Sequence, residues 1–163
     1  MSEDVTVRVP EAQLRDAVSG AMPRLTAITD AAAAKPRAPG KWSRKEIVGH
    51  LIDSASNNHE RFVRAQFTDD LLCATYDQEA WVRVQRYSAA PWGELVALWQ
   101  HFNVQLARVI EATPVEVRLR PRERHNLDQV AFRQLPAGEP ATLEYFMRDY
   151  VEHLEHHLGQ IFG

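Results

Sequence analysis

The chain has 163 residues, 45% of them hydrophobic and 25% charged, which suits a single globular domain spanning residues 1–163. Its net charge of -3 lacks the basic excess of most nucleic-acid-binding proteins, so nucleic acid is not expected as a partner. The single cysteine, Cys73, excludes an internal disulfide, and no apolar run approaches the roughly 18–20 residues that cross a bilayer, so we expect a cytoplasmic protein without a membrane partner.

Residues 1–4 are Met-Ser-Glu-Asp, an acidic start without the apolar core of a signal peptide, so none is expected. The first helix is predicted over residues 10–33, where apolar residues recur at steps of three and four. Gly20 and Pro23 should kink or break this helix, and the proline-rich residues 35–40 should end it in a loop. Because that loop is short, the first and second helices are expected to be antiparallel neighbours.

The second helix has a clear N-terminal signal. Ser43 and Glu46 have the spacing of a capping box, in which each side chain accepts a hydrogen bond from the backbone of the other. A broad apolar face follows and predicts a helix that ends near Gln66. Within residues 67–90, a short helix is predicted over Gln78–Gln85.

Pro91 suits the first position of a third long helix, which is expected to end near Ala112. The next segment, residues 113–140, is rich in proline and arginine and is predicted to be a long connection. Apolar and charged residues alternate over residues 115–119, which favours a short strand or extended segment there. Connections this long inside a compact domain are often functional.

Thr142 can cap the last helix, which is expected to reach about Phe162. The chain therefore has four long helices, with extended connections between the second and third and between the third and fourth. This pattern predicts an all-α four-helix bundle, in which the long connections leave the order of the last two helices open.

His153 and His157 are four residues apart on the last helix, which puts both imidazoles on one face with Cβ atoms about 5–6 Å apart. A transition metal can accept two such ligands through bonds of about 2.0–2.1 Å. Measured from the centre of the apolar stripe, His157 lies about 60° away, His153 about 100° and His156 about 160°, so His156 is expected to face solvent. The pattern alone leaves the pair open as metal ligands or as boundary histidines.

A zinc-like site usually has at least three protein ligands, and the best third candidate is His50 on the second helix. His50 lies well off the centre of the apolar face, which by itself favours a surface histidine. Most of its companions on that arc are small and uncharged, however, which indicates the polar wall of a cleft. These companions are Ser54, Asn57, Asn58 and Arg61.

Asp149 lies one turn before His153, and Gln160 lies three residues after His157. Either side chain could therefore hydrogen-bond a ring nitrogen of a ligand and orient it. The remaining histidines are weaker candidates. His59 is expected to be packed, His101 to be exposed and His125 to lie in the long loop.

Two motifs, in this order, resemble the DinB-like superfamily (not the DNA polymerase that shares the name). Residues 42–54, Trp-Ser-Arg-Lys-Glu-Ile-Val-Gly-His-Leu-Ile-Asp-Ser, look like the opening of helix two in that family. Residues 153–161, His-Leu-Glu-His-His-Leu-Gly-Gln-Ile, look like the end of its last helix. Each motif is weak alone, but together, about a hundred residues apart, they are fairly specific and the resemblance covers nearly the whole chain.

The resemblance implies a four-helix bundle of up-down-down-up order that is commonly a homodimer. It also implies a divalent metal, most often zinc or nickel, held by one histidine of helix two and two of helix four. By motif match these are His50, His153 and His157. One departure is Leu158, where relatives often carry arginine, and this difference bears on what lies beside the metal.

Family members are described as metal-dependent hydrolases or as transferases and isomerases that use low-molecular-weight thiols, and others have no known activity. Bound zinc lowers the pKa of water and can equally stabilise a thiolate. We hold a thiol S-transferase acting on a small molecule slightly ahead, because the polar arc of helix two suits a thiol's polar arms. A hydrolase would need a general base, for which Asp53, Glu60 and Asp149 are candidates. A non-catalytic, dimeric metal- or ligand-binding bundle is a further alternative.

Overall fold

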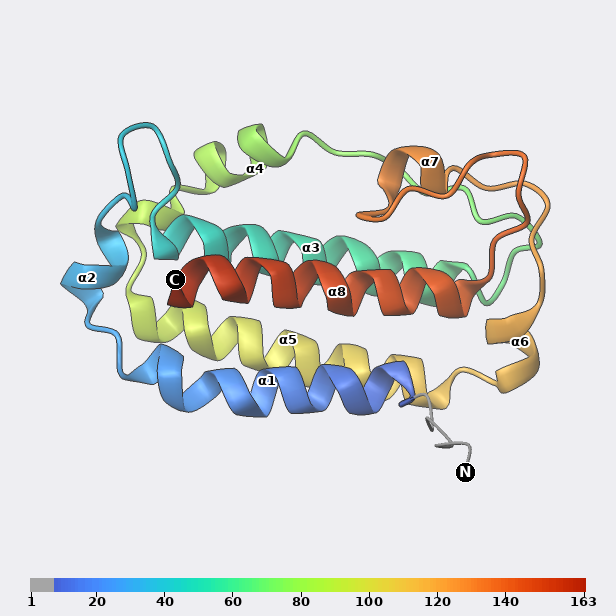
Figure 1. Cartoon of the computed structure of the whole chain (residues 1–163), viewed down its shortest axis with the longest axis horizontal. Helices are drawn as coiled ribbons and strands as arrows, with labels where there is room; N and C mark the ends of the chain where they lie inside the picture. Colours follow the sequence, from blue (N-terminus) through green and yellow to red (C-terminus); the bar gives the residue numbers. More distant parts are fainter. Residues whose placement is uncertain (1–7) are drawn as a thin grey trace, which may run out of the picture.

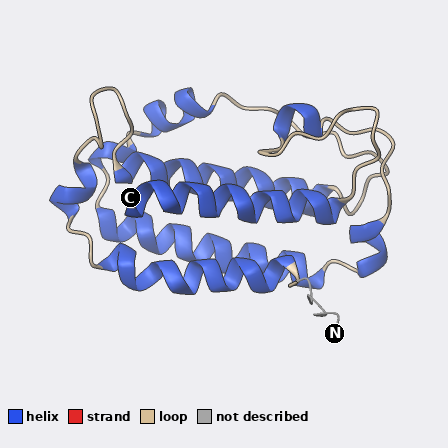
Figure 2. Cartoon of the chain, viewed as in Figure 1, coloured by secondary structure: helices blue, strands red, loops and turns tan. Residues whose placement is uncertain are grey.

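The computed structural model describes residues 8–163, and these residues form helices and loops without a β-strand (Figures 1 and 2). The acidic segment of residues 1–4, where no signal peptide is expected, lies outside the described residues. No helix in the described part is long and apolar enough to span a membrane. The helices are α1 (Pro10–Thr26), α2 (Asp30–Ala34), α3 (Arg44–Arg64), α4 (Gln78–Gln85), the 3-10 turn η1 (Tyr87–Ala89), α5 (Trp92–Ala112), α6 (Val115–Leu119), α7 (Leu127–Val130) and α8 (Leu143–Phe162).

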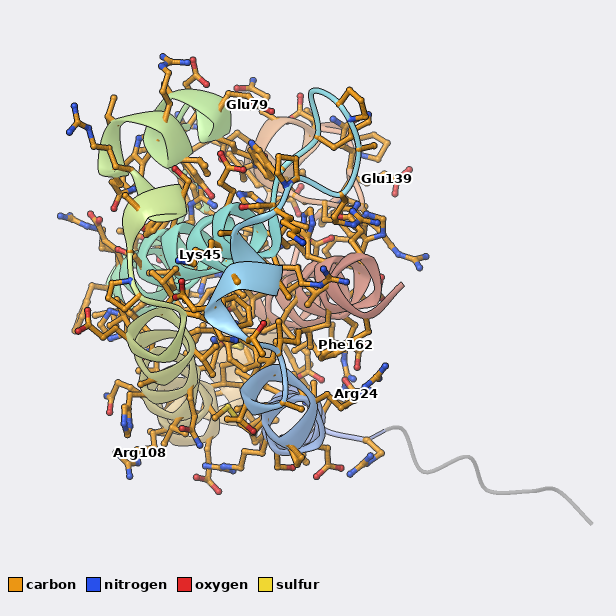
Figure 3. All side chains as sticks on the ribbon, turned by 90° about the vertical axis from the view of Figure 1, so that its left-hand side faces the viewer. Arg24, Lys45, Glu79, Arg108, Glu139 and Phe162 are labelled. Atoms are coloured by element: carbon orange, nitrogen blue, oxygen red, sulfur yellow. The ribbon has the colours of Figure 1, made fainter. Side chains whose placement is uncertain are left out.

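The four long helices α1, α3, α5 and α8 make the bundle, and they run in up-down-down-up order (Figure 1). The view along the bundle places α1 and α3 at opposite corners, each between α5 and α8 (Figure 3). The prediction that the first two helices are neighbours is therefore wrong, although they do run antiparallel. The reason is that α2 and the loop after it are long enough to carry the chain across the end of the bundle.

Two of the long helices, α3 and α8, begin where a side chain satisfies free backbone N–H groups. At α3, the Ser43 hydroxyl accepts a bond from Glu46 N at 3.3 Å, while Ser43 N donates to the Glu46 carboxylate at 2.8 Å, which confirms the capping box. Thr142 caps α8 in the same way, through a bond from Tyr145 N. The first helix, α1, continues through Gly20 and Pro23 and ends at Thr26, so neither residue breaks it.

The long connections cover one side of the bundle, over α3 and α8 (Figure 1). Residues 115–119 form the helix α6 instead of the predicted strand, because Val117 N and Arg118 N both bond to the carbonyl of Pro114. Arg118 is held near Glu11 of α1 and Glu144 of α8. A strand would have needed a partner strand to pair its backbone, and the described residues offer none.

A second constraint on α3 comes from Gly49. A Cβ atom added to Gly49 would lie 2.1 Å from the ring of Tyr87, so only glycine lets η1 approach the helix this closely. The hydroxyl of Tyr87 donates to Asp53 Oδ1 at 2.6 Å, and Gln85 Nε2 donates to the same oxygen at 2.8 Å. These contacts fasten the segment between α4 and α5 to the first half of α3, on which His50 lies.

Candidate metal centre

Three histidines from the two ends of the sequence converge between α3 and α8. His50 comes from α3, and His153 and His157 come from successive turns of α8. One ring nitrogen from each lies within 4.8 Å of the other two, and the Nε2 atoms of His50 and His153 are 3.1 Å apart. The spacing of four residues therefore does place both α8 rings on the same side as the ring from α3.

The surroundings of all three rings disfavour the charged form. His50 is only 1% exposed. Burial, with a smaller contribution from His157, lowers the pKa of His50 to about 4. Burial and the neighbouring histidines lower the pKa of His153 to about 2, and burial also lowers the pKa of His157. Neutral imidazoles have the free lone pair that a metal ligand requires, so protons compete weakly for this site.

Neighbouring side chains fix which nitrogen of each α8 histidine faces the centre. Nδ1 of His157 donates to Gln160 Oε1 at 2.8 Å, which leaves the lone pair on Nε2. Nδ1 of His153 lies 3.5 Å from the Ser54 hydroxyl, while its Nε2 faces His50. Gln160 therefore contacts the histidine beside which the sequence placed it, and Ser54, predicted only as part of the polar arc, contacts His153.

The arrangement fits a divalent transition metal. Two ligands of a tetrahedral ion, each bonded at 2.0–2.1 Å, lie about 3.3 Å apart, close to the separation of the His50 and His153 nitrogens. Nε2 of His50 faces Nε2 of His153, which makes it the candidate binding atom, whereas Nδ1 of His50 is buried without a hydrogen-bond partner among the described residues. Three imidazoles suit zinc and nickel alike, so the donor set does not identify the ion.

A cavity of about 400 Å³ opens beside the histidines. Its walls come from α3, α8 and the two long connections, and most of its lining groups are polar. They are Ser54, Asn58, Arg61, Thr75, Tyr76, Gln78, Gln129, Val130, Ala131, Phe132, Phe146, Asp149, Tyr150, His153, His156 and His157. Of the polar arc predicted on helix two, only Asn57 lies outside this lining, and its amide donates to the backbone carbonyl of Asp53.

Asp149 has a different role from the one predicted. Its carboxylate binds no histidine, and its oxygens instead accept the backbone N–H groups of Phe132, at 2.8 Å, and Arg133, at 2.6 Å. Burial raises the pKa of Asp149, although these two hydrogen bonds oppose the shift. Asp149 thus ties the long connection to α8, and Phe132 packs against the rings of His153 and His156. The sequence carried no signal for this contact, because the Asp149 carboxylate binds backbone N–H groups of a distant loop, and any residue type supplies such groups.

The other two predicted bases are also occupied. Asp53 is 2% exposed and one of its oxygens accepts bonds from Tyr87 and Gln85, although burial raises its pKa. Glu60 is exposed and pairs with Arg64 on the surface of α3. Neither carboxylate lines the cavity beside the histidines.

The remaining histidines lie where the sequence placed them, with one addition. His59 packs against Phe102, and His101 is exposed. His125 is buried in the long connection, where Nε2 lies 2.6 Å from the carbonyl of Glu139 and Nδ1 accepts the N–H of Leu127. His156 is exposed as predicted, but it also reaches the edge of the cavity.

Comparisons with known proteins agree with this fold. The sequence profile of the DinB superfamily matches residues 13–161. YfiT of Bacillus subtilis (strain 168) is 25% identical over 134 residues, which cover 82% of this chain and 70% of YfiT. A solved structure of YfiT, described as a probable metal-dependent hydrolase with an unusual four-helix bundle topology, matches 99% of this chain and 89% of its own with a TM-score of 0.76 at 20% identity.

Proposed function

This chain belongs to the DinB superfamily, and we propose that it is a metal-dependent hydrolase with His50, His153 and His157 as metal ligands. The observation that carries the proposal is the convergence of three ring nitrogens beside a polar cavity, which the side chains of His153 and His157 line. The name of YfiT as a metal-dependent hydrolase supports this activity over the thiol transfer that we had placed first.

A divalent ion held by three imidazoles would supply Lewis acidity and lower the pKa of a water molecule. The chain's own residues would hold and orient the reactants. Gln160 and Ser54 fix the two α8 ligands, and Asn58 presents an amide to the cavity beside them. Phe132, on the segment that Asp149 fastens to α8, packs against the ring of His153.

The experiment measures metal content and turnover together. Protein purified with zinc or nickel should bind one equivalent and hydrolyse members of a panel of small esters and amides without added thiol. His157→Ala should lose both the metal and the turnover, whereas His101→Ala, which changes an exposed histidine on α5, should lose neither. Stoichiometric metal retained by His157→Ala would refute the ligand assignment.

Thiol S-transfer is the second candidate, because Ser54, Asn58 and Arg61 line the cavity and could contact the polar arms of a small thiol. Turnover that appears only when a low-molecular-weight thiol is added would favour this activity over hydrolysis. Stoichiometric metal without turnover on either panel would favour a non-catalytic binding protein. We also propose a small-molecule substrate and a homodimer, the latter testable by light scattering of the metal-loaded protein.

A further inference from the structure

Among residues 8–163, Arg61 is the only lysine or arginine that lines the cavity beside the histidines. Other arginines form ion pairs with carboxylates. Arg64, one turn further along α3, pairs with Glu60. No carboxylate within residues 8–163 lies within ion-pairing distance of Arg61, and the one acidic residue in the cavity lining, Asp149, is engaged with backbone N–H groups. The cavity therefore contains a positive charge without a counter-ion from the protein.

The guanidinium is held in place. Its Nη2 donates to the carbonyl of Ala74 at 2.7 Å, and its Nη1 lies 3.4 Å from the amide oxygen of Asn58. Its carbon lies 5.8 Å from the ring centre of Tyr76 and 5.9 Å from that of Phe146. Because a guanidinium has five N–H donors in a planar fork, several remain for a ligand.

The position of Arg61 relative to the histidines follows from the helices. Arg61 lies seven residues after Ser54 on α3, and Ser54 is beside His153. On α8, which runs the opposite way, Phe146 lies seven residues before His153 and is beside Arg61. Both helices therefore place the guanidinium about 10 Å along the bundle from the metal centre.

We propose that Arg61 binds the carboxylate of the substrate, so that the enzyme acts on small organic acids whose acid group lies several bonds from the bond that reacts. The inference rests on the proposed metal-dependent function, and it adds the substrate class. A planar guanidinium fork matches a carboxylate through two parallel hydrogen bonds, which fixes the orientation as well as the charge of the bound molecule. The cavity between the two ends has room for a short chain.

The test compares two probes for the zinc-loaded protein by calorimetry. Both carry a hydroxamate that binds the metal through the same four-methylene chain, and they differ at the other end: adipic acid monohydroxamate has a carboxylate and its analogue a carboxamide. We expect the acid to bind roughly 10- to 100-fold more tightly. Arg61→Gln should abolish this preference while leaving the affinity for the carboxamide within about twofold, which also shows that the variant folds and binds zinc.

Two further variants separate recognition from a structural role. Arg64→Gln, which removes a neighbouring surface arginine, should keep the full preference, and Arg61→Lys should keep only part of it because an ammonium lacks the planar fork. An acid-to-amide ratio that is the same in the wild type and in Arg61→Gln overturns the inference alone. If neither probe binds the zinc-loaded wild type, the metal centre fails and the inference fails with it.

Discussion

At the scale of single residues, burial and close contact both disfavour protonation of the three clustered histidines. Three imidazoles in close contact could not all be protonated, since like charges at this distance repel and burial disfavours each charge further. The structure accordingly lowers the pKa of His50, His153 and His157. The lone pairs of three neighbouring ring nitrogens repel one another. A metal ion can accept all three lone pairs, whereas one proton can be shared by only two rings.

This arrangement makes the stability of the metal-free protein depend on pH. The pKa is about 4 for His50 and about 2 for His153 in the folded state, below the value of about 6.5 of an unfolded chain. As the pH falls from about 6.5 toward 4, the unfolded state therefore binds protons that the folded state excludes, and the free energy of unfolding decreases. Each such histidine contributes up to about 1.4 kcal/mol per pH unit.

Urea unfolding in the presence of a chelator, at pH 7, 6 and 5, measures this dependence. His153→Asn should reduce it, because His50 remains to contribute, and His101→Ala should leave it unchanged, because His101 is exposed. A free energy of unfolding that stays constant between pH 7 and 5 would contradict the neutral, buried state of the cluster.

Residue spacing predicted part of this site. The interval between His153 and His157 was enough to place both on one face of a helix. The burial of His50 was harder to predict, because its angle on α3 pointed away from the bundle core. Its ring packs against Trp42, which precedes α3, and against His153 and His157 of α8. The small polar residues on the same arc were the only local signal. The role of Asp149 could not be predicted, since its partners are backbone groups of residues 132 and 133.

At the scale of elements, the contact between α3 and η1 depends on one missing methyl group. In Gly49→Ala the new Cβ would overlap the Tyr87 ring, and the ring would have to move away from Asp53. We expect the free energy of unfolding to fall by about 1–3 kcal/mol or more, as for other overpacked sites. Chemical denaturation measures the change.

Gly20→Ala is the matched control on α1. A Cβ at Gly20 meets nothing within 4 Å, and alanine favours a helix interior over glycine, so this variant should gain about 0.5–1 kcal/mol. The two identical substitutions should therefore have opposite signs. Equal effects would show that helix propensity, and not the approach of Tyr87, decides the outcome at Gly49.

Helix boundaries were predictable where a side chain marks them. The capping box at Ser43 and the cap at Thr142 gave the starts of α3 and α8, and Gln78–Gln85 matches α4. Alternation misled at residues 115–119, since five residues of alternating polarity cannot distinguish a strand from one turn of an amphipathic helix. Arg122, fully buried where it donates to the carbonyls of Ala65 and Thr68, was also missed, because charged residues in a loop usually face water.

At the scale of the whole molecule, the proposed metal ligands connect parts of the chain that are far apart in sequence. His50 and His153 are separated by 103 residues, and they lie on two different helices of the bundle. An ion bound by both helices would therefore stabilise the packing of α3 against α8. The arrangement of helices around this pair followed only from the resemblance, because periodicity gives each helix a face but does not assign its neighbours.

Metal binding should consequently raise the melting temperature of the whole protein. An ion at 100 times its dissociation constant stabilises the folded state by about 2.7 kcal/mol, which corresponds to roughly 5–10 °C for a chain of this length. Differential scanning calorimetry with zinc or nickel measures the shift, and His157→Ala should abolish it. Magnesium serves as the control ion, because it prefers oxygen ligands and six-fold coordination and should leave the melting temperature unchanged. An equal rise of the melting temperature in His157→Ala would mean that the ions act elsewhere on the protein. That variant keeps the helices but loses one of the three nitrogens on which the proposed site depends.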